Sequence, residues 1–296
     1  MKIKHILFVI LLNAIWGWNF IAVKYSVADF TPFLSNMLRF LLAFVFMLPF
    51  IRHSIKGHVP SVLRIALMMG VLHFGCLYIA TSMAGGVSAV AIAAQLNVPF
   101  ATLCAVVMLK ETVGLTRIVA IAVSFIGVII MGFDPLVFDY FDALLVMTLG
   151  ALTFAIASIY MRQLRDIPPM TIQAWVAFAG IFGSMALTLL FEDNQIENVL
   201  AGSSPAWWGI VFSGLLSTVV GHGGMNYLLQ KYEVNVVVPY LLLMPFFAVS
   251  ASIVMLGEVL TPRMIIGASC TILGVVVITY RNTRKMKKAL IPGEET

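Results

Sequence analysis

Residues 88–111 read SAVAIAAQLNVPFATLCAVVMLKE, and the first 22 of them carry no charged side chain. At ~1.5 Å per residue, a helix of that length covers the ~30 Å hydrocarbon core of a bilayer. Further apolar runs of comparable length occupy most of the chain, so the sequence predicts ten membrane-spanning helices. The predicted spans are 6–23, 33–51, 63–82, 88–109, 117–133, 143–161, 171–191, 207–229, 236–256 and 264–280.

The composition of the 296 residues supports an all-α membrane protein. Hydrophobic residues make up 61% of the chain and charged residues 10%, and the mean hydropathy is +1.03. These values leave too little polar surface to solvate a globular domain of this size. The apolar runs are continuous rather than alternating, which favours helices over the strands of a membrane barrel. The longest polar connection has 14 residues, so we expect residues 1–296 to form a single transmembrane domain.

The distribution of Lys and Arg predicts the orientation. With the N-terminus in the cytoplasm, ten spans place 15 of the 18 Lys and Arg residues on the cytoplasmic side, including those of the basic tail at 281–296. Only Lys24, Arg39 and Arg263 fall on or near the outside. The positive-inside rule therefore predicts a multi-pass protein of the inner (plasma) membrane with both termini cytoplasmic. We expect the basic residues behind the net charge of +5 to interact with membrane lipid headgroups rather than with nucleic acid.

The chain repeats itself at a nearly constant offset. The segment VVMLKE at 106–111 returns as IVMLGE at 253–258, 147 residues later, and His73 matches His222 at an offset of 149. Five spans then fall in each half, and because five is odd the halves must have opposite orientation. Inverted repeats of this kind are characteristic of secondary transporters, with substrate sites near the midplane between the repeats. The repeats are expected at about 6–133 and about 143–280.

Four groups of residues give the chain a resemblance to a known family. They are Trp16-Gly17 with Asn19-Phe20 and Lys24, Arg39-Phe40, and the two Pro-to-Glu segments 99–111 and 245–258. With these residues the chain resembles the EamA-type permeases of the drug/metabolite transporter superfamily. The resemblance implies one ten-helix domain with a central cavity formed mainly by spans one, three, four, six, eight and nine.

Within that family, Ala94-Gln95 and the run 228–240 are most similar to exporters of the O-acetylserine/cysteine type. Thr153 and Phe154 depart from the family pattern, since an aromatic-small pair is common there. The departure puts strict two-fold equivalence of the site in doubt.

Two histidines fall near the centre of their spans. A polar group in hydrocarbon costs several kcal/mol unless it is paired or lines a wet cavity. His73 and His222 are therefore predicted either to face the cavity, as substrate-binding and proton-coupling groups, or to bond a neighbouring helix as packing residues. Asn226 lies one turn beyond His222 and adds a polar group to its face.

Pro99 and Pro245 lie near the middle of spans four and nine. Each removes a backbone donor and interrupts a regular helix, which either exposes carbonyls to a substrate or only kinks the helix for packing. Gln95 lies one turn before Pro99, with Asn97 beside it, so this break is polar. Both amides are candidate substrate-binding residues, Gln95 ahead of Asn97.

Aromatic and amide side chains complete the candidate site. Trp16 and Asn19 interrupt the first span, where an indole and an amide either contact a small polar solute or serve helix packing. Tyr78 and Tyr240 are further candidates. The middle depth of the predicted cavity offers amides, indole, phenol and imidazole with no firmly placed fixed charge, which suits a small zwitterion.

Four charged residues have predicted structural roles. Lys24 can snorkel at the end of its span, whereas Arg39 begins two turns inside its span and needs a partner or water. Glu111 and Glu258 end short turns, where they are expected to bond backbone amides of the next helix.

The sequence lacks the motifs of nucleotide-driven pumps, hydrolases and metalloenzymes, namely GxxxxGK[ST], GxSxG and HExxH. No cofactor or metal is expected, and the chain is expected to act as a monomer on a small-molecule substrate. The predicted function is a secondary transporter that exports a small polar metabolite, an amino acid or derivative, by alternating access. The alternatives are a broad-specificity drug exporter and a membrane-embedded enzyme that uses the two histidines.

Overall fold

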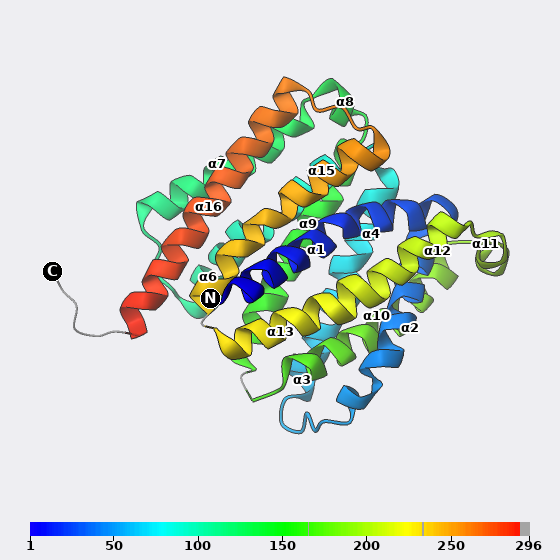
Figure 1. Cartoon of the computed structure of the whole chain (residues 1–296), viewed down its shortest axis with the longest axis horizontal. Helices are drawn as coiled ribbons and strands as arrows, with labels where there is room; N and C mark the ends of the chain where they lie inside the picture. Colours follow the sequence, from blue (N-terminus) through cyan, green and yellow to red (C-terminus); the bar gives the residue numbers. More distant parts are fainter. Residues whose placement is uncertain (165, 233, 291–296) are drawn as a thin grey trace.

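A computed structural model describes residues 1–164, 166–232 and 234–290 (Figure 1). It contains ten helical spans that are long and apolar enough to cross a membrane, which confirms the predicted all-α fold. The described residues contain no strand. The ten spans are Ile3–Asp29, Pro32–Ile51, Val59–Met83, Ser88–Leu109, Leu115–Gly132, Phe141–Gln163, Pro169–Phe191, Ser204–Lys231, Pro239–Leu256 and Pro262–Thr283.

Five spans consist mainly of one regular helix each. Their helices are α1 (Ile3–Asp29), α2 (Pro32–Ile51), α7 (Leu115–Gly132), α9 (Phe141–Gln163) and α10 (Pro169–Phe191). The last helix, α16 (Pro262–Leu290), continues ten residues past the predicted end of its span at 280. The predicted tail at 281–296 is therefore helical up to Leu290, and its last residues lie outside the described part of the chain. Hydropathy marks only the stretch in hydrocarbon, whereas Lys, Arg, Met and Leu favour a helix that continues into the headgroups.

The third and eighth spans share an irregularity. A π-helical segment η1 (Leu67–His73) joins α3 (Val59–Ala66) to α4 (Phe74–Met83). A second one, η2 (Phe212–Gly221), joins α12 (Ser204–Val211) to α13 (His222–Lys231). The two repeated histidines thus lie where the π-helical turns give way to α-helix. Such turns widen a helix locally and are frequent at functional sites.

The fourth and ninth spans are interrupted where the prolines predict it. The fourth consists of α5 (Ser88–Ala94) and α6 (Asn97–Leu109), with Pro99 in the first turn of α6. In the ninth, α14 (Val234–Val237) and a 3₁₀ segment η3 (Val238–Leu243) precede α15 (Met244–Leu256), with Pro245 in its first turn. Both interruptions precede the proline, because a first-turn proline lacks only an N–H that the helix would leave unbonded.

The two long helices of the fourth and ninth spans also end alike. The cap of α6 is Lys110 with φ 53°, and the cap of α15 is Gly257 with φ 66°. This left-handed conformation suits glycine and strains lysine. Paired features at one offset are what an internal repeat predicts, and the opposite orientation of the two halves stays a prediction.

Small residues set the closest helix contacts. α7 and α16 lie side by side (Figure 1), and a Cβ on Gly127 would come within 2.6 Å of the backbone N of Thr271. α2 packs on α10, and α1 lies against both α12 and α15 in the middle of the bundle (Figure 1). Lipid is as apolar as a leucine side chain, so close backbone approach is a main source of helix association.

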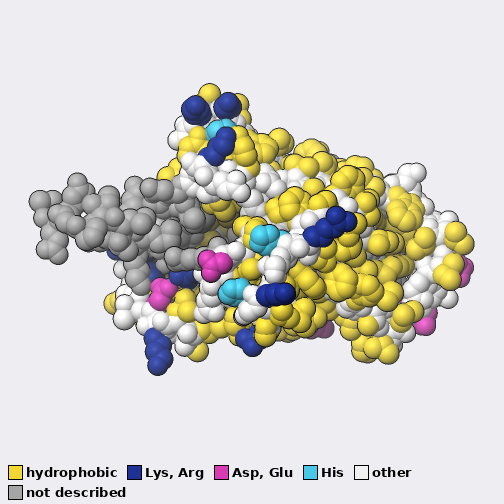
Figure 2. Space-filling view, turned by 90° about the horizontal axis from the view of Figure 1, so that it is seen from below, with side chains coloured by type: hydrophobic (Ala, Val, Ile, Leu, Met, Phe, Trp, Pro, Cys, Tyr) yellow, Lys and Arg dark blue, Asp and Glu magenta, His cyan; other side chains and the backbone are white. Residues whose placement is uncertain are grey.

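The bundle has two ends of different chemistry. The start of α1 and the end of α16 lie at one end (Figure 1), which we call the terminal end. The short helices α8 (Pro135–Phe138) and α11 (Gln195–Ala201) lie at the other, which we call the acidic end because Asp134, Glu192 and Glu258 are there. Figure 2 shows hydrophobic side chains over most of one face, with Lys and Arg in the left and middle parts of the view.

Candidate functional site

Arg39 of α2 is the largest fully buried side chain in the described part of the chain, with 1% of its surface exposed. Its Nη2 donates to Oγ1 of Thr218 in η2 at 2.8 Å, while Nε and Nη1 have no hydrogen-bond partner. The ring of Phe74 lies 4.1 Å from the guanidinium carbon, close enough for a cation–π interaction. The expectation that the site offers no fixed charge therefore does not hold. Sequence correctly marked Arg39 as needing a partner, and the structure supplies one hydroxyl.

A glycine allows η2 to pack closely against α2 at Arg39. A Cβ on Gly214 would lie 2.9 Å from the backbone oxygen of Arg39, so a larger residue there would push α2 and η2 apart. Thr218 then reaches the guanidinium from the next turn. Its hydroxyl donates to the backbone oxygen of Ser213 at 2.7 Å, which leaves a lone pair on Oγ1 to accept from Arg39.

Tyr78 of α4 completes this buried cluster. It is 0% exposed, and the Arg39 guanidinium carbon lies 5.9 Å from its ring centre. Arg39, Ser213 and Ser26 are near neighbours of its hydroxyl, yet none is at hydrogen-bonding geometry. The hydroxyl of Ser213 is likewise buried without a partner. Such groups cost free energy when left unpaired, so their concentration around one cation marks a place suited to a polar ligand.

The two histidines lie beside this cluster in different surroundings. Both are within electrostatic range of Arg39, and His222 also of His73. His73 Nδ1 lies 2.8 Å from the backbone oxygen of Gly150 in α9, so Nδ1 carries the proton it donates. This bond favours the packing interpretation for His73. The ring centres of His222 and Trp16 lie 5.6 Å apart. In the part of the chain that the structure describes, His222 makes no hydrogen bond.

Trp16 brings α1 to the site through its contact with His222. The Trp16 Nε1 donates to the backbone oxygen of Ser217 at 3.1 Å, so its ring face, rather than its N–H, is available to a solute. Asn19 is 5% exposed, and its Oδ1 has no partner.

The predicted amide site at the broken fourth span is partly buried. Gln95 lies in the turn between α5 and α6, is 5% exposed and leaves Nε2 unpartnered. Asn97, at the start of α6, is half-buried, as are Asn226 in α13 and Tyr240 in η3. Within the described part of the chain no hydrogen bond or ring contact links these three side chains to the Arg39 cluster, so their role in binding stays a prediction.

At the acidic end, a carboxylate from the second half holds a helix of the first. Glu258 Oε2 accepts from the backbone N–H groups of Val87 and Ser88, both at 3.1 Å, at the start of α5. It also accepts from the hydroxyls of Ser88, at 2.9 Å, and Ser252. The expectation of bonds to backbone amides holds for Glu258, but the helix is α5 and not the next one in sequence. Glu111 forms an ion pair with Arg162 at 3.1 Å.

Lys24 lies near Glu258 and does not snorkel. Its Nζ donates to the backbone oxygens of Ala84 at 2.5 Å and Thr81 at 3.3 Å, which are at the C-terminal end of α4. A cation there satisfies carbonyls that the helix leaves free.

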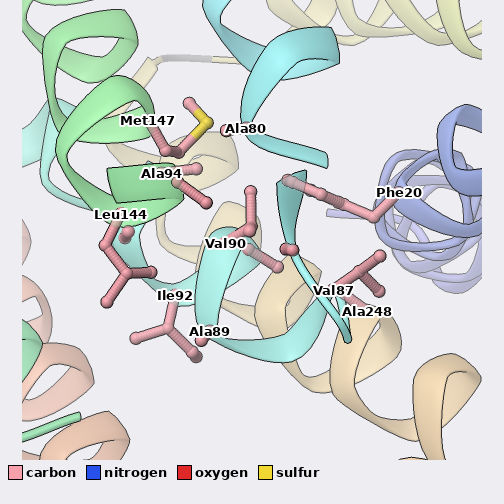
Figure 3. Packing of buried hydrophobic residues seen from close by; sticks show 14 of the residues in the cluster. Phe20, Ala80, Val87, Ala89, Val90, Ile92, Ala94, Leu144, Met147 and Ala248 are labelled. Carbon is pink, nitrogen blue, oxygen red and sulfur yellow. The ribbon is translucent and has the colours of Figure 1, made fainter. Parts of the chain in front are cut away.

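Apolar side chains from several helices pack together at the acidic end. Phe20 of α1, Ala80 of α4, Val87 just before α5, Val90 within α5, and Ala248 of α15 are buried together (Figure 3). We call these five residues the acidic-end core.

A cavity of about 160 Å³ lies beside Glu258 and is lined by Tyr140 and Met264 among others. Burial, with a smaller effect of Glu258 and Asp134, raises the pKa of Tyr140 to about 12, so this phenol stays neutral. A shallow hollow of about 670 Å³ beside α11 is remote from the Arg39 cluster. Among the described residues, no group of three or more His, Cys, Asp or Glu could hold a metal ion.

Comparison with known sequences shows the family of the chain. The sequence profile of the EamA-like transporter family matches residues 3–133 and again residues 142–280. The chain belongs to the EamA-like transporter family. This EamA chain is therefore a multi-pass membrane transporter and not an enzyme, and its two matched segments run close to the two predicted repeats.

Several curated proteins resemble this EamA chain over nearly their whole length. An "Uncharacterized transporter" of Archaeoglobus fulgidus is 26% identical, covering 90% of this chain and 95% of that protein. A "Probable amino-acid metabolite efflux pump" of Salmonella typhimurium is 23% identical, covering 92% and 93%. A solved crystal structure, at 15% identity, superposes with a TM-score of 0.64 over 97% of this chain and 100% of its own, which is evidence for the fold alone.

The structure brings Tyr78, His73 and His222 of the EamA chain close to Arg39, and places Trp16 beside His222. Sequence reasoning missed Thr218, Ser213 and Ser88 as partners. Hydroxyl residues are common in apolar spans because they can bond their own helix. No signal in a single sequence separates them from others of their kind.

Proposed function

We propose that this EamA transporter exports an amino acid or amino-acid derivative across the inner membrane by alternating access, with both termini in the cytoplasm. The observation that carries the proposal is the buried polar cluster around Arg39, which lies between helices of the two halves. A transporter must hold its substrate at such a place and release it to one side at a time.

The names of two relatives, each a "Probable amino-acid metabolite efflux pump" from Salmonella typhimurium and Escherichia coli, support an amino-acid metabolite as substrate. The mixed chemistry of the cluster agrees with this choice. A buried cation, a phenol and imidazoles suit a small polar solute, whereas the cation disfavours the hydrophobic cationic drugs of the alternative. The 15-to-3 distribution of basic residues supports the orientation.

The proposal is tested by counterflow in proteoliposomes. Vesicles loaded with one unlabelled amino acid, such as cysteine, serine or O-acetylserine, should accumulate the labelled compound, and protein-free vesicles should not. Gln95→Ala and Asn19→Ala should weaken the exchange. In cells, overexpression should lower the intracellular pool of the same amino acid and confer resistance to its toxic analogue. Resistance to hydrophobic cationic drugs with unmoved amino-acid pools would favour the multidrug alternative.

A further inference from the structure

We propose that Arg39 is the carboxylate-binding residue of this transporter, so that its substrates carry a free carboxylate which pairs with the guanidinium. The inference rests on the proposed function for the amino-acid part of the substrate. The carboxylate part rests on the geometry of Arg39 alone.

The first step is that Arg39 has no counter-ion. The described part of the chain contains no carboxylate paired with it. The four spans around it explain this, because 32–51, 59–83 and 204–231 contain no Asp or Glu, and Asp29 is the last residue of α1. A guanidinium stays protonated in proteins. Its charge is thus buried with one neutral hydroxyl and three aromatic rings, those of Phe40, Phe74 and Tyr78, which compensate it only in part.

The second step concerns the hydrogen-bonding edge that remains. A guanidinium has five N–H donors, arranged so that Nη2 shares one edge with Nε and the other with Nη1. Thr218 accepts one proton of Nη2, and Nε and Nη1 are unpartnered. Whichever Nη2 proton Thr218 takes, one complete two-donor edge is left. That edge matches the two oxygens of a carboxylate, which arginine binds in bidentate fashion.

The third step is that the surroundings hold this edge in place. Gly214 allows η2 to approach α2, the bond from Thr218 to the Ser213 oxygen orients its hydroxyl, and the Phe74 ring lies against the guanidinium. The unpartnered hydroxyls of Tyr78 and Ser213 are available to a ligand oxygen. Preorganised donors of this kind are what ligand sites require.

The test on the wild-type protein compares matched probes in counterflow. L-cysteine carries both charged groups, N-acetyl-L-cysteine keeps the carboxylate, and cysteamine keeps only the amine. The same comparison is made for L-serine, N-acetyl-L-serine and ethanolamine, and lactate serves as a carboxylate without an amine. We expect exchange to require the carboxylate, with amine-only probes at least about 30-fold weaker, as for a buried charge pair that loses one partner.

Variants locate this requirement. Arg39→Gln should abolish the preference for a carboxylate, and Arg39→Lys should recover only part of it because lysine lacks the two-donor edge. Arg64→Gln is the matched control, since Arg64 also lies over an aromatic ring, Tyr160 at 5.6 Å, but is exposed at the end of α3. If Arg39→Gln fails to fold, Thr218→Val should weaken carboxylate probes and Thr218→Ser should restore them.

The outcomes separate this inference from the proposed function. Exchange of amino acids with equally good exchange of cysteamine and ethanolamine overturns the role of Arg39 and leaves amino-acid export standing. Exchange of lactate without any amino acid or N-acetyl amino acid overturns amino-acid export and supports Arg39 as a carboxylate site. Exchange of neither class overturns both.

Discussion

Neutralising Glu258 should open the acidic end. Glu258→Gln keeps the size of the side chain but replaces charged hydrogen bonds to the Val87 and Ser88 amides with neutral ones of about half the strength. Charged acceptors contribute ~1.5–3 kcal/mol per bond and neutral ones ~0.5–1.5 kcal/mol. For two backbone amides the closed state should therefore lose about 1–3 kcal/mol relative to the open state, which is a population shift of about 5- to 150-fold.

Cysteine accessibility measures this shift. Val90 is 0% exposed in the acidic-end core and is visible in Figure 3, so Val90→Cys reports separation of the core. The native Cys76, Cys104 and Cys270 are first replaced by alanine. A membrane-impermeant maleimide added at the acidic end should then label Val90→Cys about 5- to 150-fold faster in the Glu258→Gln background, and faster still in Glu258→Ala.

Glu192 provides the matched control. It caps α2 much as Glu258 caps α5, accepting from the backbone N–H groups of Phe33 at 2.8 Å and Leu34 at 3.1 Å. It joins α2 to the end of α10, away from the acidic-end core. Glu192→Gln should lower thermal stability without changing the labelling of Val90→Cys. Equal labelling rates in wild type and Glu258→Gln, with similar losses of stability in both variants, would refute the gating role and reduce Glu258 to a helix cap.

Three further predictions follow from the charge pattern, the histidines and the helix contacts. Reporter fusions after Asp139 and Asn194 should be periplasmic and those after His53, Gln163 and the C-terminus cytoplasmic; a periplasmic C-terminus would contradict the inverted repeat. His222→Ala should flatten the pH dependence of counterflow more than His73→Ala, because His73 is hydrogen-bonded to Gly150. An unchanged pH profile in the double variant would mean that both histidines serve only helix packing. Gly127→Ala should cost about 1–3 kcal/mol of stability by overpacking α7 against α16, whereas Gly114→Ala, with open space around it, should leave the melting temperature unchanged.

The fold could be predicted because each span is specified by its own composition. A run such as 88–109 crosses a bilayer whatever its neighbours do, and Pro99 and Pro245 marked two interruptions from local stereochemistry. The ends of α1 and α16 were misplaced because hydropathy does not follow a helix into the headgroups. The π-helical turns η1 and η2 were not predicted, since no residue type requires them.

The site was predicted less well because its contacts join residues far apart in sequence. Arg39 bonds Thr218 across 179 residues, Trp16 bonds Ser217 across 201, and His73 bonds Gly150 across 77. Each of these bonds links a helix before residue 133 to one after residue 141, and so does the cap that Glu258 provides to α5. The polar contacts therefore lie on the surface between the two segments that the family profile matches separately. Motion of one segment against the other would change every one of these contacts at once, so a ligand held by Arg39 and Tyr78 would bias the position of η2 as directly as Glu258 biases that of α5.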